Sequence, residues 1–148
     1  MRWIDQARMC ALRYPQNKKE AGIIKRYARK NRKACEIRSR GVAKPVEAAV
    51  IAMSDDNRLL LLQREIEAVD HAMRELEKIA KNERESIKVR QIAADAAKLA
   101  RLTYIQGSHT LQGSANVMFL AEATAYRYNK LFLKLVAANM GYLPANKG

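Results

Sequence analysis

The stretch Thr110-Leu-Gln-Gly-Ser-Ala-Asn-Val-Met-Phe-Leu-Ala-Glu-Ala-Thr-Ala-Tyr-Arg-Tyr-Asn-Lys130 has the apolar spacing of two short helices joined by a tight turn. Ala115 is small, as the first helix requires at the point where it touches the second. The positions expected to flank the turn or to face inward are Ala115, Met118, Leu120, Ala125, Tyr128 and Leu131. The stretch therefore predicts a pair of crossed helices, and the rest of the chain can be interpreted as their support.

The outer side of the second helix carries a short polar row, and in a helix-turn-helix this side enters the major groove of DNA. The expected DNA-binding residues are Glu122, Thr124, Tyr126, Arg127, Lys130 and Lys134. Arg127 is the expected base contact, because its guanidinium can bond both acceptors of guanine. Lys130 and Lys134 are expected to hold the DNA backbone. Thr124 and Tyr126 are expected to touch phosphate or a thymine methyl group.

The composition of the whole chain indicates a helical protein with a polyanionic partner. Hydrophobic residues make up 49% of the 148 residues, with only three prolines, and no run alternates β-branched residues with period two. The net charge is +13. The expected fold class is all-α: a helical bundle with a C-terminal helix-turn-helix, a long heptad-patterned central helix and a basic N-terminal helical arm.

Most of the positive charge lies near the N-terminus. Residues 18–44 contain eleven Lys or Arg against Glu20 and Glu36, which gives +9 of the total. Charges of one sign with few carboxylate partners repel one another unless an anion relieves them. A helical arm over residues 18–38 is therefore expected to touch nucleic-acid phosphates without reading sequence, although a solvated face is the alternative. The expected phosphate contacts are Lys25, Arg26, Arg29, Lys30, Arg32 and Lys33.

The central helix, expected over residues 56–81, has the strongest periodic pattern in the chain. Its apolar residues alternate three and four apart, as in a coiled-coil seam. The residues of this seam are Leu59, Leu62, Ile66, Val69, Met73 and Leu76. Dimerisation through the seam and packing against other helices of the same chain both use such a stripe, and self-association is slightly favoured, as a homodimer.

Capping and turn-forming residues suggest where the remaining helices begin and end. Pro15 is expected to end a first helix over residues 2–14. Residues 39–44 are expected to be a linker, and a short helix over residues 45–53 is expected to stop before a cap formed by Ser54-Asp55-Asp56. After a turn at residues 82–85, a scaffold helix is expected to run to Gln106 and to close at Gly107.

These breaks divide the chain into three expected segments. Residues 1–44 form the N-terminal basic helical arm, and residues 45–83 form the central helices with the possible dimerisation coil. Residues 84–148 form the DNA-binding helix-turn-helix domain.

Motifs for catalysis, cofactor binding or metal binding are missing from the sequence. It contains no phosphate-binding glycine loop, no GxSxG and no HExxH motif, and His71 and His109 stand apart. Cys10 and Cys35 are isolated and are expected to be reduced, packed thiols rather than a disulfide or metal ligands. Because these motifs are missing, no cofactor and no enzymatic activity are expected. No apolar run is long enough for a membrane span, and an intracellular protein is therefore expected.

Residues 102–115 and 123–130, Leu-Thr-Tyr-Ile-Gln-Gly-Ser-His-Thr-Leu-Gln-Gly-Ser-Ala and Ala-Thr-Ala-Tyr-Arg-Tyr-Asn-Lys, resemble the C-terminal region of phage-encoded transcriptional regulators of the RinA/ArpU type. The resemblance implies a helix-turn-helix similar to sigma region 4. It also implies an activator of late phage genes that works at promoters with host RNA polymerase, in the bacterial cytoplasm at the nucleoid. Two positions depart from the usual motif: Ala121 or Ala123 stands where Ser or Thr commonly caps the second helix, and Phe119 stands where many such turns carry glycine.

Two other functions fit the same pattern. A small terminase subunit of a phage also joins a helix-turn-helix to oligomerising helices, but it forms a ring for DNA packaging. A basic adaptor would bind nucleic acid without sequence preference, in a weak and salt-sensitive manner.

Overall fold

The fold is all-α, as the composition predicts, and the described part of the chain contains helices and no strand. The computed structural model describes residues 2–38 and 45–144, except for the side chains of residues 28, 31–38 and 45–55. The expected linker at residues 39–44 lies outside the described residues. The elements are α1 (Trp3–Leu12), α2 (Tyr14–Arg38), α3 (Pro45–Lys81), α4 (Ile87–Ala100), the π-helix η1 (Arg101–Ile105), α5 (Leu111–Val117) and α6 (Glu122–Met140).

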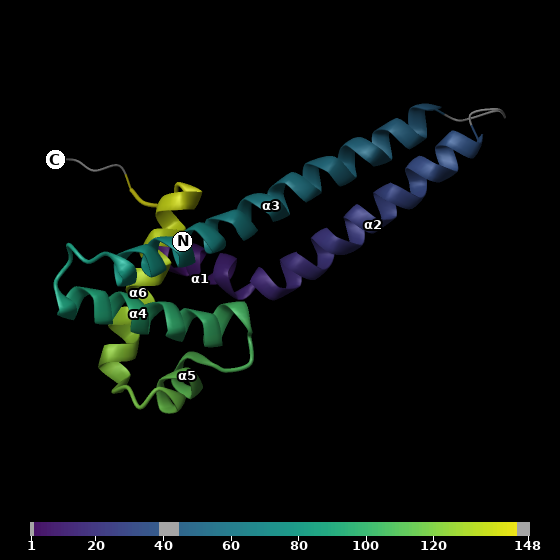
Figure 1. Ribbon diagram of the computed structural model, residues 1–148. Coiled ribbons are helices and arrows are strands. Elements are labelled where there is room, and N and C mark those ends of the chain that lie inside the picture. Colours follow the sequence, from purple (N-terminus) through teal and green to yellow (C-terminus); the bar gives the residue numbers. More distant parts are fainter. Residues whose placement is uncertain (1, 39–44, 145–148) are drawn as a thin grey trace.

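The helices form a bundle from which a long hairpin projects (Figure 1). α2 and α3 run side by side in opposite directions and make up this hairpin. At the other end of α3, the helices α1, α4 and α6 pack around it, and α5 lies on the far side of α4 and α6. The basic segment of α2 is therefore held along α3.

One hydrophobic core joins all three segments expected from the sequence. Its buried residues include Cys10 of α1, Val69 of α3, Ala96 of α4 and Phe132 of α6. The ring of Phe132 stacks on that of Tyr104, with 5.4 Å between the ring centroids. Because α1 belongs to this core, the basic arm begins at α2 and not at the N-terminus.

The junction between α1 and α2 is tied to α3 by polar contacts. The first helix ends at Leu12, and α2 begins at Tyr14 with Pro15 in its first turn, where a missing N–H costs nothing. The Tyr14 hydroxyl donates to Asp70 at 2.6 Å. Asn17 donates to the Glu65 carboxylate at 2.6 Å, and Arg13 pairs with the same carboxylate. These contacts fix the base of the hairpin against α3.

The expected break in the central helix is wrong. α3 is continuous from Pro45 to Lys81, so Ser54-Asp55-Asp56 is not a cap between two helices. Ser and Asp are only modestly unfavourable inside a helix, and neither glycine nor proline follows Pro45 within it. The helix can therefore run through them.

The expected seam of α3 faces the interior of this chain. Leu62, Val69, Met73 and Leu76 are buried, while Leu59 and Ile66 are half-buried. α3 contacts α2, α4 and α6 along its length. Such a seam can serve dimerisation or packing within the chain, and these side chains pack against helices of the same chain. A homodimer stays a prediction and would need another surface.

The scaffold helix before the helix-turn-helix ends in an irregular turn. Ser86 caps α4 by accepting a hydrogen bond from the Val89 amide at 3.2 Å. After Ala100 the helix widens into the π-helix η1, which no pattern in the sequence predicts. Gly107 then adopts a left-handed backbone with φ 64°, which confirms the expected helix end.

Candidate nucleic-acid interface

The predicted helix-turn-helix is formed by α5, a tight turn and α6. The Thr110 hydroxyl caps α5 by accepting a hydrogen bond from the Gly113 amide at 3.1 Å. In the turn, the Leu120 amide donates to the carbonyl oxygen of Ala115 at 2.9 Å. Phe119 takes the left-handed backbone, with φ 56°, where glycine is usual, and its side chain is 96% exposed. This residue therefore carries backbone strain of about 1 kcal/mol or more without burying its ring.

A small cluster holds α5 and α6 against α4. Ala115, Ala125 and Leu99 are buried in it, and the partly buried residues packed around them are Leu111, Met118, Leu120 and Tyr128. The inward positions predicted from the sequence are thus confirmed, with one exception. Leu131 is 44% exposed, because the buried side of α6 passes through Asn129, Phe132 and Leu133 instead.

The π-helix contributes one hydrogen bond to each helix of the motif. The Thr103 hydroxyl donates to the carbonyl oxygen of Leu99 at 2.9 Å and so accepts from the Ser114 hydroxyl of α5 at 2.8 Å. The Tyr104 hydroxyl donates to the side-chain oxygen of Asn129 in α6 at 2.5 Å. Both pairs are buried, so they fix the orientation of α5 and α6 relative to the bundle.

The start of α6 has no side-chain cap. Ala121 occupies the N-cap position and makes no capping hydrogen bond, as its identity predicts. The negative charge of Glu122, in the first turn, interacts favourably with the positive end of the helix dipole and so stabilises the start of α6. Six predicted DNA-binding residues are on α6: Glu122, Tyr126, Arg127, Lys130 and Lys134 are exposed, and Thr124 is half-buried.

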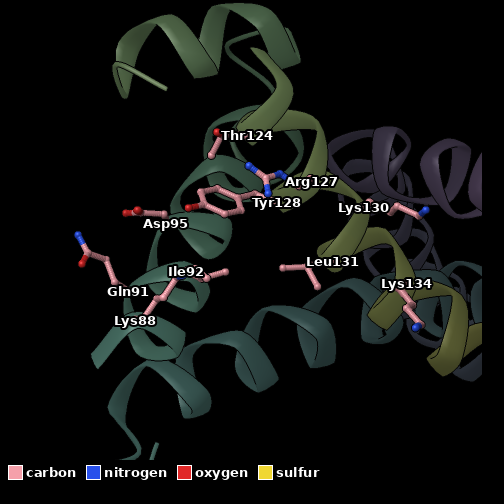
Figure 2. A pocket seen from close by; sticks show the side chains of 10 residues that line it. All are labelled: Lys88, Gln91, Ile92, Asp95, Thr124, Arg127, Tyr128, Lys130, Leu131 and Lys134. Atoms are coloured by element: carbon pink, nitrogen blue, oxygen red, sulfur yellow. The ribbon is translucent and has the colours of Figure 1, made fainter. Parts of the chain in front are cut away.

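Arg127, Lys130 and Lys134 line one groove together with α4. Figure 2 shows this groove, which measures about 700 Å³, with α6 along one side and α4 along the other. Thr124 also borders it, and α4 adds Lys88 and Asp95. Its apolar lining is made by Ile92, Tyr128 and Leu131. Four cations and one carboxylate therefore border the groove, which favours an anionic ligand.

Lys88 is a candidate contact that the sequence analysis missed. It lies in the first turn of α4, two turns before Asp95, and only the fold brings it to the same groove as Lys134. Its spacing from Gln91 and Asp95 indicates that the three residues share one face of α4, but the spacing alone does not show which other helix lies beside that face.

Tyr126 lies on a different side of α6 from Arg127. It borders a second groove with Arg8 of α1 and His109 of the loop before α5. It also lies beside Gln112 of α5. The predicted contacts therefore fall into two groups: Thr124, Arg127, Lys130 and Lys134 border the α4–α6 groove, whereas Glu122 and Tyr126 border the groove beside α5.

The predicted phosphate contacts of the arm are partly described. Lys25, Arg26, Arg29 and Lys30 are exposed on α2. The side chains of Arg32 and Lys33 lie outside the described residues.

The thiol of Cys10 is buried, as predicted, while the side chain of Cys35 lies outside the described residues. Burial, and to a smaller extent the Glu65 carboxylate, raise the pKa of Cys10 to about 12, so the thiol is unreactive near neutral pH. Among the side chains that the structure describes, no three His, Cys, Asp or Glu residues gather as metal ligands would. Among the described helices, none has an apolar stretch long enough to cross a bilayer.

Comparison with known proteins gives no family, since no protein-family model, curated protein or solved structure matches the chain. The resemblance to RinA/ArpU-type regulators therefore stays a prediction from the sequence.

Proposed function

We propose that the protein is a sequence-specific DNA-binding transcriptional regulator that places the outer face of α6 in the major groove. The observation that carries this proposal is the exposed basic row of Arg127, Lys130 and Lys134 on the second helix of an α5–turn–α6 motif. This is the side that a helix-turn-helix presents to DNA. No catalytic role is part of the proposal.

The residues divide the work of binding according to their chemistry. Arg127 reads a guanine through its two acceptors, and Lys130, Lys134 and Lys88 neutralise phosphates beside it. Glu122, at the start of α6, supports the helix end and can accept a hydrogen bond from a cytosine amino group. Thr124 and Tyr126 are left to touch phosphate or a thymine methyl group.

The basic arm adds phosphate contacts to this scheme. Lys25 and Arg29 are exposed and lie one turn apart on α2, so they can follow a backbone without reading bases. Arg32 and Lys33 belong to the same sequence run. Such contacts raise affinity for all DNA, whereas α6 provides the preference for one site.

The resemblance to phage regulators extends the proposal to its biological setting. In that setting the protein activates late genes of a phage or prophage at promoters, with host RNA polymerase, in the bacterial cytoplasm at the nucleoid. A homodimer, expected from the sequence, would then recognise two half-sites related by twofold symmetry.

Selection of bound DNA from a random pool tests this function. The proposal expects one enriched motif, which a nonspecific adaptor would not give. Light scattering on the purified protein checks the assembly in parallel: a dimer agrees with a regulator, whereas a ring of many subunits would indicate a small terminase subunit. A pool that stays random after several rounds would contradict the proposal.

A further inference from the structure

The side of α2 that faces away from α3 combines exposed apolar and basic side chains. Ile23 and Tyr27 lie one turn apart on it and are 61% and 58% exposed. Lys19, Arg26 and Lys30 are also exposed and share this side by their helical spacing. These five residues are called the α2 outer face. Two large exposed apolar side chains one turn apart form a small patch, and an apolar patch rimmed by charged residues is typical of a protein-binding surface.

The charge of the α2 outer face is not neutralised within the described part of the chain. Glu20, which precedes Ile23 by one turn of α2, is paired with Arg58 of α3. Among the described residues, none forms an ion pair with Lys19, Arg26 or Lys30, and Arg26 only donates from Nε to the carbonyl oxygen of Gly22 at 3.3 Å. Three cations therefore border the apolar pair, and no carboxylate that the structure describes is paired with them.

These two properties together select the kind of partner. Duplex DNA would pair its phosphates with the cations but would leave Ile23 and Tyr27 in water. A second copy of the chain would bring like charges together. An amphipathic helix with acidic edges would bury the apolar pair and neutralise the charge, because its apolar stripe covers Ile23 and Tyr27 while its carboxylates pair with the cations.

We propose that the α2 outer face docks an acidic amphipathic helix of a partner protein. The hairpin leads away from α5 and from the start of α6 (Figure 1), so a helix bound there leaves the basic row of α6 free. Lys25 and Arg29 lie on another side of α2 and are not part of this contact. The proposal stands independently of DNA binding by α6.

The test uses the full-length protein and a designed, fluorescently labelled peptide. The peptide is an amphipathic helix with leucine on one face and glutamate elsewhere; a scrambled peptide of the same composition has no apolar stripe. Fluorescence anisotropy should show binding of the amphipathic peptide about tenfold tighter than that of the scrambled one. Replacing Ile23→Ser and Tyr27→Ser together should remove this difference, because only the apolar contact distinguishes the peptides.

Matched variants keep the result specific to this surface. Ile87→Ser, at an apolar residue that is also highly exposed but lies at the start of α4, should leave peptide binding unchanged. Lys19→Glu with Arg26→Glu and Lys30→Glu should abolish binding of both peptides, and circular dichroism should show the helices intact. Arg127→Ala should not alter peptide binding, so failure of this proposal is distinct from failure of the DNA-binding proposal.

Three outcomes overturn the inference. Equal binding of the two peptides would mean that the face attracts any polyanion. Displacement of the amphipathic peptide by an equal concentration of a random DNA duplex, if it persists in the Lys25→Ala, Arg29→Ala variant, would assign the face to phosphates. Unchanged peptide binding by the Ile23→Ser, Tyr27→Ser variant would place the contact elsewhere.

Discussion

The hydroxyl of Tyr104 donates a hydrogen bond across 2.5 Å to the side-chain oxygen of Asn129 in the protein interior. Tyr104 lies in the π-helix η1, and Asn129 lies in the middle of α6. Burial raises the pKa of Tyr104 to about 12, so its hydroxyl keeps its proton and remains a donor. This bond links the scaffold to the helix that carries the basic row.

Replacing Tyr104→Phe should lower the free energy of unfolding by about 1–3 kcal/mol, because the buried oxygen of Asn129 loses its donor. Urea unfolding followed by circular dichroism measures the change. Tyr126→Phe removes an exposed hydroxyl from α6, the helix that carries Asn129. Its free energy of unfolding should stay within about 0.5 kcal/mol of that of the unchanged protein. Similar losses in the free energy of unfolding for the two variants would show that the buried hydrogen bond does not stabilise the fold.

Phe119→Gly should raise the free energy of unfolding by about 1 kcal/mol, because glycine adopts the left-handed backbone without strain and an exposed ring is lost. Val117→Gly, close by at the end of α5 but with an ordinary helical backbone, should instead destabilise by about 0.5–1 kcal/mol. Thermal or urea unfolding of the two variants measures these opposite changes in stability. A loss of stability in the Phe119→Gly variant would mean that the ring makes a favourable contact.

Stability should fall as the pH rises from about 9 to about 12. Burial raises the pKa of Cys10 from 9.0 to about 12 and that of Tyr104 from 10.0 to about 12. The folded state therefore holds both protons over a range in which the unfolded chain releases them, so alkali favours unfolding. Free energies of unfolding measured from about pH 8 to about pH 11 should decline less steeply in Cys10→Ala. An unchanged slope in that variant would exclude the buried thiol as a cause.

Lys88→Ala should weaken binding to a selected site and to a random duplex by the same factor. The slope of log affinity against log salt concentration should become smaller by about 1, as expected for one lost phosphate contact. Lys81→Ala, at the exposed end of α3, is the control and should leave the slope unchanged. A loss confined to the selected site would instead mean that Lys88 contacts a base.

Local sequence signals were sufficient for much of the helix-turn-helix. The small residue at Ala115, the capping hydroxyl of Thr110 and the glycine at position 107 each act within a few residues, and each is found as predicted. The exposure of Arg127 also follows from helical spacing once α6 is placed correctly. These features depend on neighbours in sequence, which a single chain reveals.

Features that depend on distant partners were missed or misplaced. Helical spacing does not predict that the polar residue Asn129 is buried, because its partner Tyr104 is 25 residues upstream. Helical spacing predicts that Leu131 faces inward, but α1, α3 and α4 pack against neighbouring positions of α6 instead. Ser54-Asp55-Asp56 has the composition of a cap, yet α3 continues through it. Tertiary packing decides each of these cases.

The central claim is that Arg127 reads a base from the outer face of α6. The most direct measurement compares the affinities of the unchanged protein and Arg127→Ala for the selected site and for a random duplex, with Arg84→Ala, an exposed arginine in the turn before α4, as control. Arg127→Ala should cost about 1–3 kcal/mol on the selected site and little on the random duplex. Equal losses on both duplexes, or no loss on either, would contradict a reading role for this helix.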